Sequence, residues 1–202
     1  MLEKVALQLT QIMIRQNIID PADEEVYVYG WSITISTLGS LIVLLLIGAF
    51  LGKLVGTALF LAFFILLRIY AGGYHANSYG RCFFITMLFY APGPILHFYL
   101  PSTYIDLTIA MSMVTAIGIT WRWAPVDHPN KPLNIKDKQK NKKISRTIVL
   151  GQAAIVTLIG AWQPWAKQYL LWAAIGMAVT SFTLLYVIYN PYKKGGGANE
   201  IT

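Results

Sequence analysis

The single cysteine and a histidine seven residues before it are the residues of this chain best suited to chemistry. His75 and Cys82 lie in a segment that also contains Gly72-Gly73 and Asn77-Ser78. On one unbroken helix, seven residues would separate the two side chains by about 10 Å. Glycine, asparagine and serine are typical of turns, and a turn between antiparallel helices allows a thiol and an imidazole to meet as nucleophile and base.

The position of Cys82 strengthens the case for a nucleophile, because it begins an apolar run with Arg81 directly before it. A helix N-terminus and a neighbouring cation both favour the thiolate, and Arg68 is a second candidate cation. The alternative is that Cys82 is a small packing residue and His75 a solvated loop residue. One cysteine excludes an intramolecular disulfide, and the histidines show no metal-ligand spacing, so neither a metal nor a cofactor is predicted.

The composition predicts a membrane protein that positions these residues on helices. Of 202 residues, 56% are hydrophobic and 12% are charged, and the mean hydropathy is +0.54. Soluble domains carry about 25% charged residues, so a soluble globule is excluded. We expect an all-α integral membrane protein with a six-transmembrane-helix bundle; the spans are Val26–Gly52, Leu54–Tyr70, Cys82–Leu100, Leu107–Trp121, Thr147–Ala166 and Gln168–Tyr189.

We expect a single membrane domain, residues 1–192, with a flexible tail at 193–202. Residues 1–19 have helical apolar periodicity, which fits an amphipathic interfacial helix or a helix packed on the protein's own loops. Asp20-Pro21 is a helix-start signal. Pro92-Gly93-Pro94 must break the third span, and His97 beside it is interpreted as a satisfied polar group of the bundle.

The net charge of +7 becomes informative once each basic residue is assigned to one side of the membrane. With six spans and a cytosolic N-terminus, 14 of the 16 basic residues fall on the cytosolic side. The positive-inside rule therefore puts both termini and the 71–81 connection in the cytosol of a multi-pass cell-membrane protein, and nucleic acid is no longer a partner.

A basic cytosolic loop is predicted over residues 122–146. Its charge is interpreted first as a solvated surface facing anionic membrane lipids, and alternatively as a site for an acidic segment of a substrate. The candidate substrate-binding residues are Lys131, Lys136, Lys138, Lys140, Lys142 and Lys143.

Two motifs of the chain resemble those of the accessory gene regulator protein B (AgrB) family. They are Arg68-Ile69-Tyr70-Ala71-Gly72-Gly73-Tyr74-His75, with Cys82 seven residues on, and Ala124-Pro125-Val126-Asp127 followed by Asn130-Lys131-Pro132. The family consists of membrane cysteine endopeptidases of peptide quorum sensing in Gram-positive bacteria. The resemblance implies that Cys82 is the nucleophile and His75 its base, with Arg68 and Gly73 in supporting positions. No residue of the sequence is identifiable as the group that orients His75.

The resemblance also implies a substrate, an AgrD-type precursor peptide with an amphipathic leader, a signal segment and an acidic C-terminal tail. Cleavage of the tail through a thioester on Cys82, followed by attack of a cysteine or serine of the signal segment, would give a thiolactone or lactone. Two other classes stay open, a non-enzymatic transporter or exporter of a signalling peptide and a scaffold for a signalling partner. The many glycines and aromatic residues also leave a homodimer open.

Overall fold

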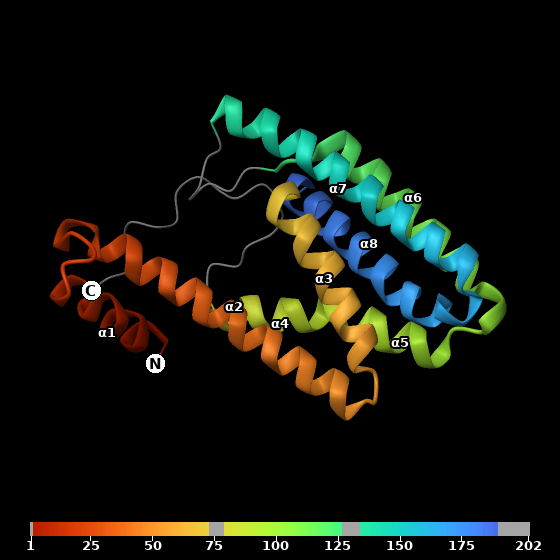
Figure 1. The fold of residues 1–202 in the computed structure, drawn as a ribbon, viewed down its shortest axis with the longest axis horizontal. Coiled ribbons are helices and arrows are strands. Elements are labelled where there is room, and N and C mark those ends of the chain that lie inside the picture. Colours follow the sequence, from red (N-terminus) through yellow and green to blue (C-terminus); the bar gives the residue numbers. More distant parts are fainter. Residues whose placement is uncertain (1, 73–78, 127–133, 190–202) are drawn as a thin grey trace.

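The computed structural model describes residues 2–72, 79–126 and 134–189, and every regular element in these ranges is a helix (Figure 1). Short 3₁₀ turns, η1 (Pro21–Asp23), η2 (Ser102–Tyr104) and η3 (Pro164–Ala166), precede α2, α6 and α8. The predicted all-helical class is therefore confirmed. The helices are α1 (Leu2–Arg15), α2 (Glu24–Phe50), α3 (Leu54–Ala71), α4 (Tyr79–Tyr90), α5 (Pro92–Tyr99), α6 (Ile105–Trp123), α7 (Ile135–Trp162) and α8 (Lys167–Tyr189).

Five of the described helices, α2, α3, α6, α7 and α8, are long and apolar enough to cross a membrane. The chain is a multi-pass membrane protein on this ground. The predicted third span is a shorter apolar segment, Phe83–Tyr99, which breaks at Ala91 between α4 and α5. A helix of that length rises about 26 Å, against about 30 Å for a hydrocarbon core, so this segment spans less of a bilayer than the other five.

Helix α8 forms the centre of the bundle, between α3 and α6 (Figure 1). In its apolar window 78% of residues are buried, against 17–39% in the other long spans. The closest approach to α3 is at Gly176, where an added Cβ would lie 2.6 Å from the Phe60 carbonyl oxygen. Small residues allow helix backbones in a membrane to approach in this way.

Hydroxyl groups of α8 bond to backbone carbonyls of its two neighbours. Thr180 Oγ1 donates to the Phe64 carbonyl of α3 at 3.1 Å, and Ser181 Oγ donates to the Ala116 carbonyl of α6 at 3.3 Å. A polar group within an apolar phase must find its partner inside the protein. Each hydroxyl also lies within bonding distance of a carbonyl of α8 itself, Gly176 for Thr180 and Met177 for Ser181, so the bonds to α3 and α6 add to the contact at Gly176 in holding α8 against its neighbours.

Trp172 joins α8 to α3 and α5 at the other end of the bundle. Its indole is fully buried between Gly56 and Gly93, where an added Cβ would lie 2.6–2.8 Å from the ring. The indole Nε1 donates to His97 Nδ1 at 3.2 Å. This bond confirms His97 as a satisfied polar group of the bundle, and the ring explains why the helix break contains a glycine.

The start of the first span agrees with its sequence signal. Asp20 Oδ1 accepts a hydrogen bond from the Ala22 amide at 2.9 Å, and Pro21 is the first residue of η1. A short carboxylate side chain at this position satisfies an amide that the helix leaves without a partner.

Helix α1 packs against α2, so the N-terminal segment is helical as predicted but has a protein partner. Ala6 and Thr10 are fully buried, and Trp31 Nε1 contacts Met13 Sδ at 3.4 Å. The small side chains of Ala6 and Thr10 allow the two helices to lie close together. Val5 and Ile12, two of the periodic apolar residues of this segment, stay exposed, which leaves α1 an apolar face outside the bundle.

The prediction of a loop over residues 122–146 is wrong for a large part of that range. Helix α6 continues to Trp123, and α7 begins at Ile135, so the basic run belongs to the first turns of α7. Lysine and glutamine are good helix formers, and no glycine or proline interrupts residues 135–146. The three prolines lie between these two helices in the sequence, at positions 125, 129 and 132.

Replacing Gly176 by alanine should destabilise the bundle by about 1–3 kcal/mol, because the new methyl group meets backbone of α3 that cannot move aside. Thermal unfolding in detergent, followed by circular dichroism, measures the effect. Gly151→Ala in α7 is the matched control, since nothing lies within 4 Å of its added Cβ. Equal midpoints for the two variants would contradict the close contact.

Candidate active site

The end of α3 carries the first predicted site residue and the turn that leads to the others. Arg68 lies in the last turn of α3, with its guanidinium 5.3 Å from the centre of the Phe64 ring. The helix ends at Ala71, and Gly72 follows with φ +80° and ψ −154°. That backbone conformation is almost restricted to glycine. Gly72 therefore determines how the chain leaves α3 toward the predicted histidine.

Gly72 is paired with Val126, a residue of the second sequence motif. The Val126 amide donates to the Ala71 carbonyl at 3.0 Å, and Gly72 and Val126 form an isolated parallel bridge. A Cβ added to Gly72 would collide with the Val126 carbonyl oxygen. The two motifs are thus held together at the backbone, although they are far apart in the sequence.

Helix α4 begins at Tyr79, which places the backbone of Arg81 and Cys82 in its first turn. The prediction that Cys82 begins the third apolar segment agrees with this. The first amides of a helix have no partner within the helix and create a partial positive charge. The side chains of Arg81 and Cys82 lie outside the described part of the chain, as do Gly73, His75 and the turn residues Asn77 and Ser78. The predicted contact between thiol and imidazole thus stays a prediction.

The predicted substrate-binding lysines lie at the same end of the bundle. The described ones are exposed, on the first turns of α7, while Lys131 lies outside the described residues. Figure 1 shows that α7 begins where α3, α6 and α8 end. The described lysines are Lys136, Lys138, Lys140, Lys142 and Lys143.

The bridge between Gly72 and Val126 is the feature that sequence reasoning missed. The pair of glycines before His75 and the prolines after Trp123 both indicated irregular backbone. Neither pattern indicated that one irregular segment is the hydrogen-bonding partner of the other.

Comparison with known proteins agrees with this arrangement of helices and motifs. The family model Accessory gene regulator B matches residues 6–187. Putative AgrB-like protein 2 of Clostridium perfringens (strain 13 / Type A) is 24% identical over 201 residues, covering 93% of this chain and 92% of the relative. Accessory gene regulator protein B of Staphylococcus aureus (strain MW2) is 26% identical over 163 residues, covering 80% and 82%. No solved structure matches significantly.

The fold and the motifs define a multi-pass membrane protein whose motif segments meet at one end of the bundle. The chain belongs to the accessory gene regulator B family. This is a peptidase family of bacterial quorum sensing that processes the precursors of autoinducing peptides.

Replacing Gly72 by alanine should lower the rate of precursor cleavage at least tenfold. The substitution costs about 1–3 kcal/mol in backbone strain and removes the space for the Val126 carbonyl, so the segment leading to His75 is displaced. Cleavage by purified protein in detergent is the measurement. Gly118→Ala in α6 is the control, because its added Cβ meets nothing within 4 Å. Cleavage by Gly72→Ala at the control's rate would count against the role of the bridge.

Proposed function

We propose that this protein is a membrane cysteine endopeptidase that removes the acidic C-terminal tail of an AgrD-type precursor and cyclises the remaining signal segment. Membership of the accessory gene regulator B family is the observation that carries the proposal. The start of α4 three residues before Cys82, the chain's only cysteine, supports the role of this residue as nucleophile.

In the first half of the reaction, His75 takes the proton of the Cys82 thiol, and Sγ attacks the carbonyl carbon at the junction with the tail. A carbon–sulfur bond forms, and the tetrahedral intermediate collapses by breaking the carbon–nitrogen bond. His75 then gives the proton to the leaving amine, so the tail departs with a new N-terminus. The precursor is left as a thioester on Cys82.

In the second half, a thiol or hydroxyl group of the signal segment attacks the thioester carbonyl. His75 takes the proton of that group and returns it to the Cys82 sulfur as the carbon–sulfur bond to the enzyme breaks. Thioester exchange conserves the type of bond, so the ring forms without another source of energy when the attacking group is a thiol. A serine nucleophile gives the lactone.

Water must not reach the thioester before the internal nucleophile does. We propose that the site forms between the end of α3, with its Ala71–Val126 backbone bond, and the start of α4. Exclusion of water from such a site favours cyclisation over hydrolysis.

The orientation that we propose places this end of the bundle in the cytosol. Arg68, Arg122 and the basic start of α7 lie at this end. Lys53 and Lys167 lie at the opposite end, where Lys167 Nζ pairs with Asp106 at 2.7 Å. The positive-inside rule assigns the more basic end to the cytosol.

Purified protein and a precursor peptide encoded beside its gene provide the test of the catalytic pair. Cys82→Ala and His75→Ala should each lower cleavage by at least about a hundredfold, since a positioned acid or base contributes about 10²–10⁴. A precursor that lacks its internal thiol or hydroxyl should accumulate on wild-type protein as a thioester, seen by mass spectrometry and released by hydroxylamine. Cleavage by Cys82→Ala at the wild-type rate would contradict the proposed peptidase activity and favour an exporter.

The exposed lysines at the start of α7 are proposed to attract the acidic tail. Lys136, Lys138 and Lys140 stand on the turns that precede the contact of α7 with Trp121. Charges of one sign gathered at one end of a helix raise the local concentration of an oppositely charged segment.

Changing these three lysines to glutamine should raise the dissociation constant of the precursor about tenfold at low salt, because each exposed pair contributes about 0.5 kcal/mol. The difference should shrink at high salt, where exposed charges are screened. A precursor with a neutral tail is the control, and its affinity should not respond to the substitutions. An unchanged affinity for the acidic precursor at low salt would reject this docking site.

A further inference from the structure

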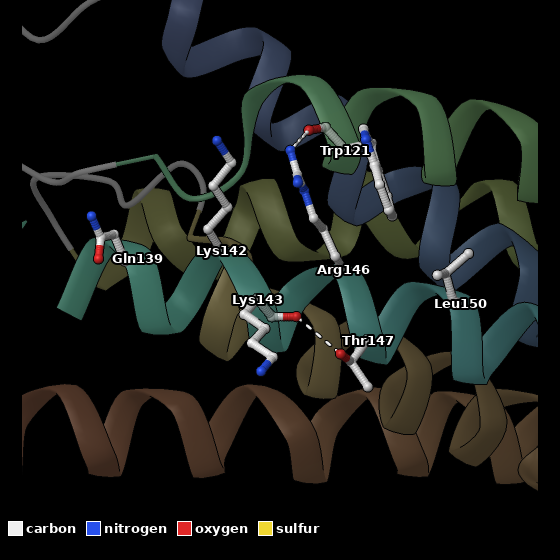
Figure 2. Close-up of a pocket in the computed structure, with 7 residues that line it drawn as sticks. All are labelled: Trp121, Gln139, Lys142, Lys143, Arg146, Thr147 and Leu150. Carbon is white, nitrogen blue, oxygen red and sulfur yellow. Dashed lines mark hydrogen bonds between the residues drawn. The ribbon is translucent and has the colours of Figure 1, made fainter. Parts of the chain in front are cut away.

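A groove of about 350 Å³ lies between the end of α6 and the start of α7, outside the proposed active site. Figure 2 shows its lining, with Trp121 on α6 and the other side chains on the first turns of α7. The residues of this α6–α7 groove are Trp121, Gln139, Lys142, Lys143, Arg146, Thr147 and Leu150.

The guanidinium of Arg146 is held in a fixed position in the α6–α7 groove. Its Nη2 donates to the Trp121 carbonyl at 2.7 Å, and the central carbon of the guanidinium, Cζ, lies 4.4 Å from the centre of the Trp121 ring. Its Nε is buried and has no hydrogen-bond partner within the described residues. Because Nε is covered, a ligand in the groove would bond to the terminal nitrogens of Arg146, of which Nη2 alone is bonded within the described residues, to Trp121.

Lys142 stands one helical turn before Arg146, and both side chains extend toward α6, while Lys143 extends away from them (Figure 2). Like charges at this spacing repel each other. In the part of the chain that the structure describes, no carboxylate pairs with Lys142 or Arg146. A single anion between the two groups would remove this repulsion.

The deep end of the groove is apolar. Arg146 is the last charged residue of α7, since residues 147–162 carry no charge. Leu150, one turn further along α7, is 45% exposed, and Trp121 is 47% exposed. The groove therefore has cations where the uncharged part of α7 begins, and exposed apolar side chains further along the helix. A phospholipid has the same order, with a phosphate at the surface and acyl chains beneath it.

We propose that the α6–α7 groove binds an anionic phospholipid, with the headgroup phosphate between Lys142 and Arg146 and an acyl chain along Leu150 and the Trp121 ring. The guanidinium of Arg146 suits a phosphate because it always carries its charge and keeps N–H donors beside the one that bonds to the Trp121 carbonyl. Basic pockets between membrane helices bind acidic headgroups for the same reason. An acidic peptide or free phosphate would use the cations and leave the apolar end of the groove empty.

Native mass spectrometry of the purified full chain, titrated with phosphatidylglycerol or with phosphatidylcholine of the same acyl chains, tests the proposal. Wild-type protein should retain one phosphatidylglycerol with at least fivefold preference over phosphatidylcholine. Lys142→Gln with Arg146→Gln should lower the retained phosphatidylglycerol about tenfold. Lys136→Gln with Lys140→Gln removes the same charge at the same spacing on the same helix, outside the groove, and should leave retention within twofold of wild type.

Thr147→Trp provides a second variant, which fills the groove and keeps every charge, and it should also lower retention. Circular dichroism shows which variants are folded. If the Lys142→Gln, Arg146→Gln variant does not fold, lipid retention by Thr147→Trp decides whether the groove binds the lipid. Equal losses in the two double variants would overturn the site in favour of diffuse charge. Displacement of the lipid by equimolar inorganic phosphate or a glutamate-rich peptide would overturn the assignment to a lipid. No precursor is present, so the result does not depend on the proposed peptidase activity.

Discussion

The close contact between α3 and α8 is the interaction on which the rest of the bundle depends. Gly176 brings the α8 backbone against Phe60, and the neighbouring α3 carbonyls then accept bonds from Thr180 of α8 and, through Phe63, from Gln152 of α7 at 2.9 Å. In an apolar phase the Gln152 amide nitrogen has no water to bond to, so its bond to α3 and the close fit at Gly176 both favour this register of the helices. With α6 held to the same central helix, the ends of α3 and α6 come side by side, close enough for Ala71 and Val126 to bond.

Much of this fold could be predicted because a long uncharged segment crosses a bilayer as a helix, in which every backbone hydrogen bond is made within the segment. The bounds expected for α3 and α8 differ from the observed ones by single residues. The start of α7 could not be placed this way, because a lysine-rich run indicates solvation and leaves the backbone conformation open. The pairing of Gly72 with Val126 also escaped prediction. It joins backbone groups of two irregular segments, and side-chain periodicity carries no information about such a bond.

For the candidate site, residue type and spacing indicated a nucleophile and a base, and the helix start before Cys82 supports the first of them. What spacing could not indicate is that the segment after α6 is bonded to the end of α3, from which the chain continues toward His75. Val126 is bonded to Ala71 and bridged to Gly72, so the described parts of the two motifs are held together. The basic start of α7, where we propose that an acidic segment binds, lies at the same end of the bundle as this bond.

The break at Ala91 has a geometrical consequence for Cys82, the proposed nucleophile. Trp172 fixes the chain at Gly93, and from the break α4 runs back nine residues to Cys82, a rise of about 13 Å. The position of the Cys82 backbone along and around the axis of α4 is therefore set by its distance from that fixed point. Inserting or deleting one residue in α4 would turn the nucleophile by about 100° around the helix axis and shift it by about 1.5 Å. Substitutions along α4 leave the position of residue 82 around the helix axis unchanged, whereas a change in the length of α4 does not.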